Sequence, residues 1–154
     1  MLPFRLSKNA HKWFRGLERG FNSEAPMYEV FYFCAMAGLA ARRKSEIPSA
    51  ETTELVNYFP GEYRAKGRLI VALFLSREIH ALGIKTTERK ALHAAVADLV
   101  HPLSPSYLSE AGVKELNKYS HGGFDVLAEE FANPPQAIET FLPLFKQFID
   151  RTAQ

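Results

Sequence analysis

The stretch YEVFYFCAMAGLAARRK, residues 28–44, decides the fold class of this 154-residue chain. From Val30 to Ala41 it holds twelve uncharged, mostly apolar residues, which cover most of the circumference of a helix. We expect such a helix to be buried on nearly every side. Because Ala35, Gly38 and Ala41 recur every three residues, one side is nearly smooth, and a second helix can approach it closely.

The other apolar patterns also have the helical spacing of three and four residues, and residues that end helices separate them. Residues 2–6 form a short extended candidate, and Ser7 is a good N-cap for the helix that follows. The expected helices span approximately 8–19, 25–43, 49–58, 62–82, 86–100, 110–121, 124–131 and 134–150. The sequence therefore predicts an all-α fold, a compact single-domain bundle of seven or eight helices over residues 1–154.

Three local features set expectations about helix ends and burial. The pair Gly122–Gly123 is typical of a helix terminator between two short helices, because glycine is a weak helix former. Asn133, followed by Pro134 and Gln136, matches a capping box that opens the last helix. The seven apolar residues 69–75 predict a buried helix centre.

Charge is distributed unevenly, although the formal net charge is only +2. Residues 1–90 carry fifteen Lys and Arg against nine Asp and Glu, and residues 91–154 carry four against eight. The sequence shows no linker, repeat or low-complexity segment, so these are a basic part and an acidic part of one domain. Such a molecule suits a subunit that meets an anion with one face and a protein with another.

The most specific hint of function lies in the first helix. At about 100° per residue, four cations fall within roughly 60° of one face. We name them the basic strip: Lys8, Lys12, Arg15 and Arg19. The opposite face is apolar and holds Ala10, Trp13, Phe14, Leu17 and Phe21. The strip can bind an anion while the apolar face packs on a core; the alternative is an ordinary solvated face.

Two further groups of cations extend the potential anion-binding surface. Arg42, Arg43 and Lys44 end the apolar helix, where they either compensate its negative pole or hold a phosphate. Arg64 and Arg68 lie one turn apart on a later helix. With the basic strip they supply up to nine cations, enough for salt-dependent, sequence-independent binding to a nucleic-acid backbone if the fold gathers them.

We expect no catalysis, metal or cofactor. The five histidines lack the spacing of a helical zinc site, and no nucleophile elbow, P-loop or dinucleotide fingerprint occurs. Cys34 lies among apolar residues, which predicts a buried, inert thiol. Arg77, Glu78 and His80 are expected to form a structural network. An enzyme such as a nuclease or hydrolase is a further alternative.

The single cysteine and the length of the apolar run indicate the cellular compartment. A single cysteine forms no internal disulfide, which fits a reducing environment, and the longest apolar run is too short to span a bilayer core of about 30 Å. We therefore expect a cytoplasmic protein without membrane contact. The basic, acid-poor residues 1–22 also fit an organelle transit peptide, which is the alternative.

Part of the sequence resembles a known family. Residues 4–8, a helix with Trp13 and Leu17, and the apolar residues 33–37 are similar in layout to the small DndE-type proteins of bacterial DNA phosphorothioation systems. Residues 66–69, KGRL, followed by an apolar helix, resemble the second half of that family, and the part after about residue 103 has no counterpart in it. The resemblance implies an all-α, non-enzymatic accessory subunit that contacts DNA through surface Lys and Arg and can oligomerise.

The sequence therefore predicts a non-catalytic accessory subunit of a bacterial DNA-handling or anti-phage defence complex, which binds the nucleic-acid backbone through a basic helix face. The acidic, Phe-rich C-terminal half is expected to hold larger protein subunits of that complex, and a homo-oligomer is a further expectation. The alternative is a protein assembly or adaptor subunit whose charged faces dock complementary proteins without nucleic-acid contact.

Overall fold

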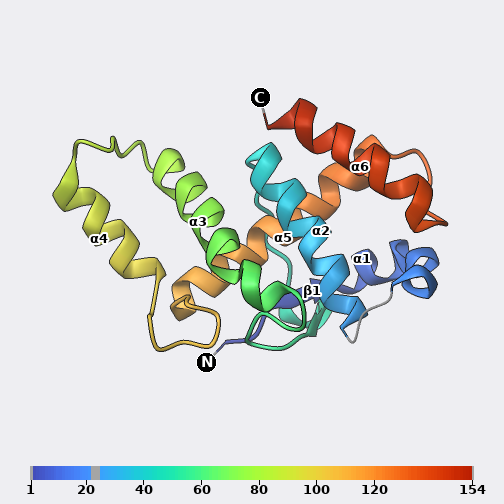
Figure 1. Ribbon diagram of the computed structural model, residues 1–154, viewed down its shortest axis with the longest axis horizontal. Helices are drawn as coiled ribbons and strands as arrows, with labels where there is room; N and C mark the ends of the chain where they lie inside the picture. The colour runs from blue at the N-terminus through green and yellow to red at the C-terminus, as the bar shows by residue number, and fades with distance from the viewer. Residues whose placement is uncertain (1, 22–24, 154) are drawn as a thin grey trace.

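The computed structural model describes residues 2–21 and 25–153. Over these ranges it contains six α-helices, two 3-10 helices and one two-stranded sheet, which confirms the predicted all-α class. In chain order the elements are β1 Arg5–Ser7, α1 Lys8–Trp13, η1 Arg15–Gly20, α2 Pro26–Ala41, η2 Ser49–Glu51, β2 Thr52–Glu54, α3 Tyr63–Ala81, α4 Arg89–Leu99, α5 Glu110–Glu130 and α6 Ile138–Thr152. Figure 1 shows α2 and α5 at the centre, with α3 and α4 on one side and α1, η1 and α6 on the other.

The centre of the fold is the crossing of α2 and α5, whose backbones touch. A Cβ atom at Gly38 would lie 1.9 Å from the carbonyl oxygen of Tyr119, and one at Gly123 would lie 1.7 Å from that of Cys34. Both distances are far shorter than a van der Waals contact, so only glycine fits at either position. The smooth side predicted for the apolar helix is confirmed, and α5 is the helix that approaches it.

The helix end predicted at Gly122–Gly123 is wrong, because α5 continues to Glu130. Glycine in a helix interior costs about 1 kcal/mol relative to Ala. Here the two glycines let α5 lie directly against α2 and the loop that follows it, since a Cβ at Gly122 would lie 2.3 Å from the carbonyl oxygen of Arg43. Close tertiary packing outweighs the local preference.

The N-terminal segment enters the fold as a strand. β1 pairs antiparallel with β2, with Arg5 opposite Glu54. The backbone N–H of Phe4 donates a hydrogen bond to the carbonyl oxygen of Val56, and the Phe4 carbonyl accepts one from Leu55, which extends the pairing. The helix predicted over 49–58 is therefore wrong beyond its first three residues. Its β-branched threonines favour the extended chain, and long-range pairing with β1 fixes that conformation.

The helix predicted over 8–19 exists in two pieces. Ser7 begins α1 as expected, because its hydroxyl accepts a hydrogen bond from a backbone N–H of the first turn at 3.3 Å. At Phe14 the chain changes from α to 3-10 geometry and continues as η1. Gly16 explains this change, since it has low helix propensity and a Cβ there would lie 2.6 Å from the carbonyl oxygen of Pro135.

The capping box predicted around residues 133–136 does not open α6, which begins at Ile138. Two successive prolines, Pro134 and Pro135, keep the preceding residues out of helical geometry. The segment packs against η1 instead and becomes one wall of the surface described below.

Helix α3 is buried on one face only. Ile70, Val71 and Phe74 are buried, whereas Leu69 is 63% exposed and Leu73 is 40% exposed. The prediction that residues 69–75 form a buried helix centre is therefore wrong for the outer half of the helix. Figure 1 shows α3 and α4 together beside the central pair. Within the described ranges, no helix is both long and apolar enough to cross a membrane.

Candidate nucleic-acid interface

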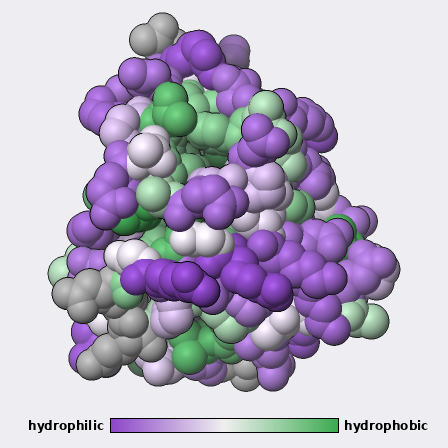
Figure 2. Space-filling view, turned by 90° about the vertical axis from the view of Figure 1, so that its right-hand side faces the viewer, coloured by the Kyte–Doolittle hydropathy of each residue, from purple (hydrophilic) through white to green (hydrophobic). Residues whose placement is uncertain are grey.

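The basic strip lies on α1 and η1 and faces outward. All four of its side chains are exposed, and none forms an ion pair with a carboxylate in residues 2–21 or 25–153. Glu18, the acidic residue within η1, is paired instead with His11 at 2.6 Å. Figure 2 shows the side of the molecule on which α1 and η1 lie, and a hydrophilic band crosses it.

Two open grooves adjoin along the strip, and Lys12 borders both of them. The first has a volume of about 720 Å³ and lies between η1 and the segment before α6; Arg15 and Arg19 also border it. The second has a volume of about 320 Å³ and lies among α1, residues 47–51 and α5; Lys8 also borders it. Because the grooves share Lys12, all four cations belong to one surface.

Acidic and aromatic side chains shape this surface. Glu139 borders the first groove, and Glu51 and Asp125 border the second, so phosphates are best accommodated along the cationic edge. Trp13 lines the first groove and Phe124 lines the second, with their ring centres 6.0 Å apart. An aromatic ring beside cations is a suitable platform for an unpaired base.

The cations that follow α2 differ in their availability. Arg42 ends the helix in the left-handed conformation at φ 55°, and its guanidinium lies 3.2 Å from Nε2 of His80. Arg43 donates two hydrogen bonds to the carboxylate of Glu129, at 2.8 and 2.9 Å. Only Arg42 of these two is free of a carboxylate partner among the described residues.

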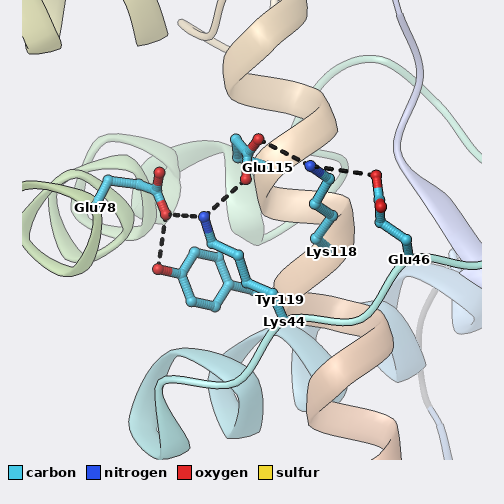
Figure 3. A network of polar contacts seen from close by, with 6 residues as sticks. All are labelled: Lys44, Glu46, Glu78, Glu115, Lys118 and Tyr119. Carbon is cyan, nitrogen blue, oxygen red and sulfur yellow. Dashed lines mark hydrogen bonds and ion pairs between the residues drawn. The ribbon is translucent and has the colours of Figure 1, made fainter. Parts of the chain in front are cut away.

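Lys44 belongs to the polar network drawn in Figure 3. Its Nζ lies 2.6 Å from a carboxylate oxygen of Glu78 and 2.7 Å from one of Glu115. The hydroxyl of Tyr119 donates to the same Glu78 oxygen at 2.7 Å, and Lys118 donates to Glu115 at 3.1 Å. The network joins the loop after α2 to α3 and α5, so Lys44 has a structural role.

The ionised forms in this network stabilise one another. Burial raises the pKa of Glu115, but hydrogen bonds from Lys44 and Lys118 lower it by more, and the net pKa lies below the ordinary value. Burial lowers the pKa of Lys44, and its bonds to Glu115 and Glu78 raise it by more. Glu78 is only 6% exposed. The sequence predicts a structural role for Glu78, but its partners come from other elements rather than from Arg77 and His80.

Arg64 and Arg68 are exposed on α3, away from the strip. The guanidinium of Arg68 lies 5.5 Å from the ring centre of Tyr107, and Arg64 borders a pocket that Tyr107 also lines. In Figure 1, α3 lies on one side of α2, whereas α1 and η1 lie on the other. The structure therefore gathers the four cations of the strip, but not all nine predicted cations, on one surface.

The remaining chemically active groups are dispersed or buried. Among the described residues, no three His, Cys, Asp or Glu side chains lie close enough to hold a metal ion. Cys34 is fully buried, as predicted, and burial raises the pKa of its thiol. His121 is 7% exposed, and its Nδ1 has no hydrogen-bond partner within the described chain. Burial lowers the pKa of His121 to about 4, so its ring is neutral at pH 7.

Sequence reasoning located the strip but missed the wall opposite it, formed by Pro134, Gln136 and Ile138. The available signal was the proline pair at 134–135, which argues against a helix at these residues. No family model, curated protein or solved structure matches this chain. The geometry of the surface is therefore the basis for a functional proposal.

Proposed function

We propose that this chain binds the phosphate backbone of nucleic acid through the basic strip, as a non-catalytic accessory subunit of a bacterial DNA-handling or anti-phage defence complex. The observation that carries the proposal is that four exposed cations share one surface and have no carboxylate partner among the described residues. By contrast, Arg43 and Lys44 are neutralised internally. The link to a defence complex rests on the resemblance to DndE-type proteins alone.

The number of cations sets the expected strength of binding. If each of the four neutralises one phosphate, the logarithm of the binding constant falls with that of the salt concentration at a slope of about −3.6 on duplex DNA. On a single strand the slope is about −2.8. Binding of this kind is weak and carries no sequence information, which suits a subunit that acts inside a larger complex.

The proposal is tested by fluorescence anisotropy with a labelled duplex and a labelled single strand across a salt series. The test variant is Lys12→Glu with Arg15→Glu. The matched control is Lys85→Glu with Lys90→Glu, which changes net charge equally at exposed residues away from the strip. We expect the test variant to weaken binding about tenfold or more at low salt and to halve the slope, while the control retains the slope.

Two results would contradict nucleic-acid binding through the strip. One is an equal loss of affinity in both double variants, which would indicate a response to net charge alone. The other is the absence of binding by the wild-type chain even at the lowest salt. In the second case the alternative gains support, because the strip would then be available to an acidic protein surface. Circular dichroism of each variant verifies that helicity is retained.

A further inference from the structure

We infer that the outer face of α3 docks an amphipathic helix of another protein, one whose apolar stripe is flanked by Asp or Glu. At about 100° per residue, five small or apolar residues lie within roughly 100° of one side of α3. This outer face comprises Ala65, Leu69, Ala72, Leu73 and Ser76, all exposed. A stripe of this width is what a surface helix normally turns toward a core.

The orientation of α3 is fixed, so this face cannot turn inward. On the opposite side, the hydroxyl of Tyr63 donates a hydrogen bond to the buried carboxylate of Glu29 on α2. Nearer the other end of α3, Glu78 accepts a hydrogen bond from Tyr119 of α5 at 2.7 Å. Phe74 lies between these two anchors and is fully buried. Rotation of α3 would break both buried hydrogen bonds and expose Phe74.

The shape of the outer face suits a helix. Ala65, Ala72 and Ser76 are small enough to let a second backbone approach, and Leu69 and Leu73 protrude to fill the grooves of a partner helix. At 1.5 Å per residue, the 19 residues of α3 extend about 28 Å. This length accommodates a partner helix of about five turns.

The charge at the edges selects the kind of partner. Lys66 and Arg77 lie along one edge of the outer face and Arg68 lies along the other. Among the described residues, none of the three forms an ion pair. Acidic residues on both flanks of a partner helix would complete ion pairs along both edges. Glu62, the N-cap residue of α3, places one carboxylate of this chain at the N-terminal end of the face.

A second copy of this chain fits the same face poorly. In an antiparallel pair each edge meets the equivalent edge of the other helix, which brings Lys66 near the Arg77 of the other copy. In a parallel pair opposite edges meet, and Arg68 then faces Lys66. Like charges approach each other in both arrangements. A lipid surface is also a poor fit, because two leucines among small residues insert little apolar area.

The inference is tested with two synthetic helical peptides of about 20 residues. Both carry the same Leu and Ala stripe, and one has Glu on both flanks where the other has Lys. We expect the full-length chain to bind the Glu peptide at least about tenfold more tightly, by fluorescence anisotropy, with the difference shrinking as salt rises. The variant Leu69→Asp with Leu73→Asp should lose this binding, whereas Leu103→Asp, at an 87% exposed leucine outside α3, should retain it.

A second variant keeps the test decisive if the double aspartate variant fails to fold. Arg68→Glu with Arg77→Glu leaves the apolar stripe intact and should reverse the preference from the Glu peptide to the Lys peptide. Equal affinity for both peptides, or binding that survives both double variants, would overturn the inference. So would a wild-type dimer in sedimentation that Leu69→Asp dissociates, or binding to vesicles of phosphatidylserine and phosphatidylcholine that the Glu peptide does not displace. The test is independent of nucleic-acid binding, because the basic strip lies on α1 and η1.

Discussion

Gly123 of α5 and Cys34 of α2 lie so close together that a Cβ atom on Gly123 would be 1.7 Å from the Cys34 carbonyl oxygen. The two helices therefore meet backbone to backbone, with no side chain between them. Gly38 and Tyr119 repeat this relationship one turn farther along α2. Together the two contacts fix the crossing point on which the other helices are assembled.

The first prediction concerns the variant Gly123→Ala. In an ordinary helix interior the change stabilises by about 1 kcal/mol. Here the added methyl group must separate α2 from α5, and we expect a loss of about 3 kcal/mol or more in the free energy of unfolding. Chemical denaturation measures the loss. The control Ala128→Gly, at an exposed position of α5, should cost only about 1 kcal/mol; a smaller cost for Gly123→Ala would contradict the close crossing.

The second prediction concerns the network of Lys44. The variant Lys44→Met removes the lysine partner of the nearly buried Glu78 carboxylate and leaves the hydrogen bond from Tyr119, and it should lower the free energy of unfolding by about 1–3 kcal/mol. Tyr119→Phe should cost about 1 kcal/mol through its lost hydrogen bond. Lys146→Met removes an exposed ion pair with Asp150 and should change stability by less than about 0.5 kcal/mol. Equal effects of the two lysine variants would argue against a structural network.

The third prediction concerns acid stability and His121. Its folded pKa of about 4 lies below its ordinary value, so between pH 6.5 and about 4 the unfolded chain binds a proton that the folded chain excludes. The contribution of His121 to the free energy of unfolding should therefore be fully present above pH 6.5. It should fall by up to about 3 kcal/mol as the pH drops through this window.

The pH dependence of the urea midpoint checks this expectation. Glu115 also contributes, because its lowered pKa gives stability that is lost as the pH falls through its folded value. The variant His121→Gln should flatten the curve between pH 6.5 and 4.5, while His93→Gln, at an exposed position, should leave the wild-type slope. A curve for His121→Gln with the full wild-type slope would show that the carboxylates alone cause the acid sensitivity.

The fourth prediction separates free cations from paired ones. Arg15→Ala removes a strip cation without a carboxylate partner among the described residues and should weaken duplex binding, reducing the salt slope by about 1. Arg43→Ala removes a guanidinium that Glu129 already neutralises, and it should leave the slope unchanged. Anisotropy titrations at several salt concentrations measure both. A similar loss in the two variants would mean that Arg43 exchanges Glu129 for phosphate.

Local patterns in the sequence predicted the elements whose stability is local. The apolar run of α2, the N-cap at Ser7 and the helical period of α4 and α6 all gave helices at the expected places. The errors lie where distant segments meet. Thr52 extends because it pairs with β1, and Gly122 stays helical because α2 and its loop lie against it. The smooth side of α2 was visible in the sequence, but no local pattern identified the distant segment that packs against it.

At the candidate site, too, the features set by local sequence were predictable and those set by contacts between distant segments were not. The exposure of the basic strip was predictable, because the opposite side of the same segment is aromatic and had to be buried. The pairing of Arg43 and Lys44 with Glu129, Glu78 and Glu115 depends on the position of α5, which the predicted break in that helix had obscured. Counting charges in the sequence therefore overestimated the number of free cations on one surface.

The contact of α2 with α5 also determines when, during synthesis, the apolar surface of α2 is covered and protected from aggregation. The ribosome completes α2 before α3, α4 and α5 exist, and α2 is apolar on nearly every side. Until residues 119–123 have left the exit tunnel, the side of α2 at Gly38 has no partner helix, and the nascent helix exposes its surface to other chains or to a chaperone. The translation rate between residues 41 and 123 thus governs how long this vulnerable interval lasts.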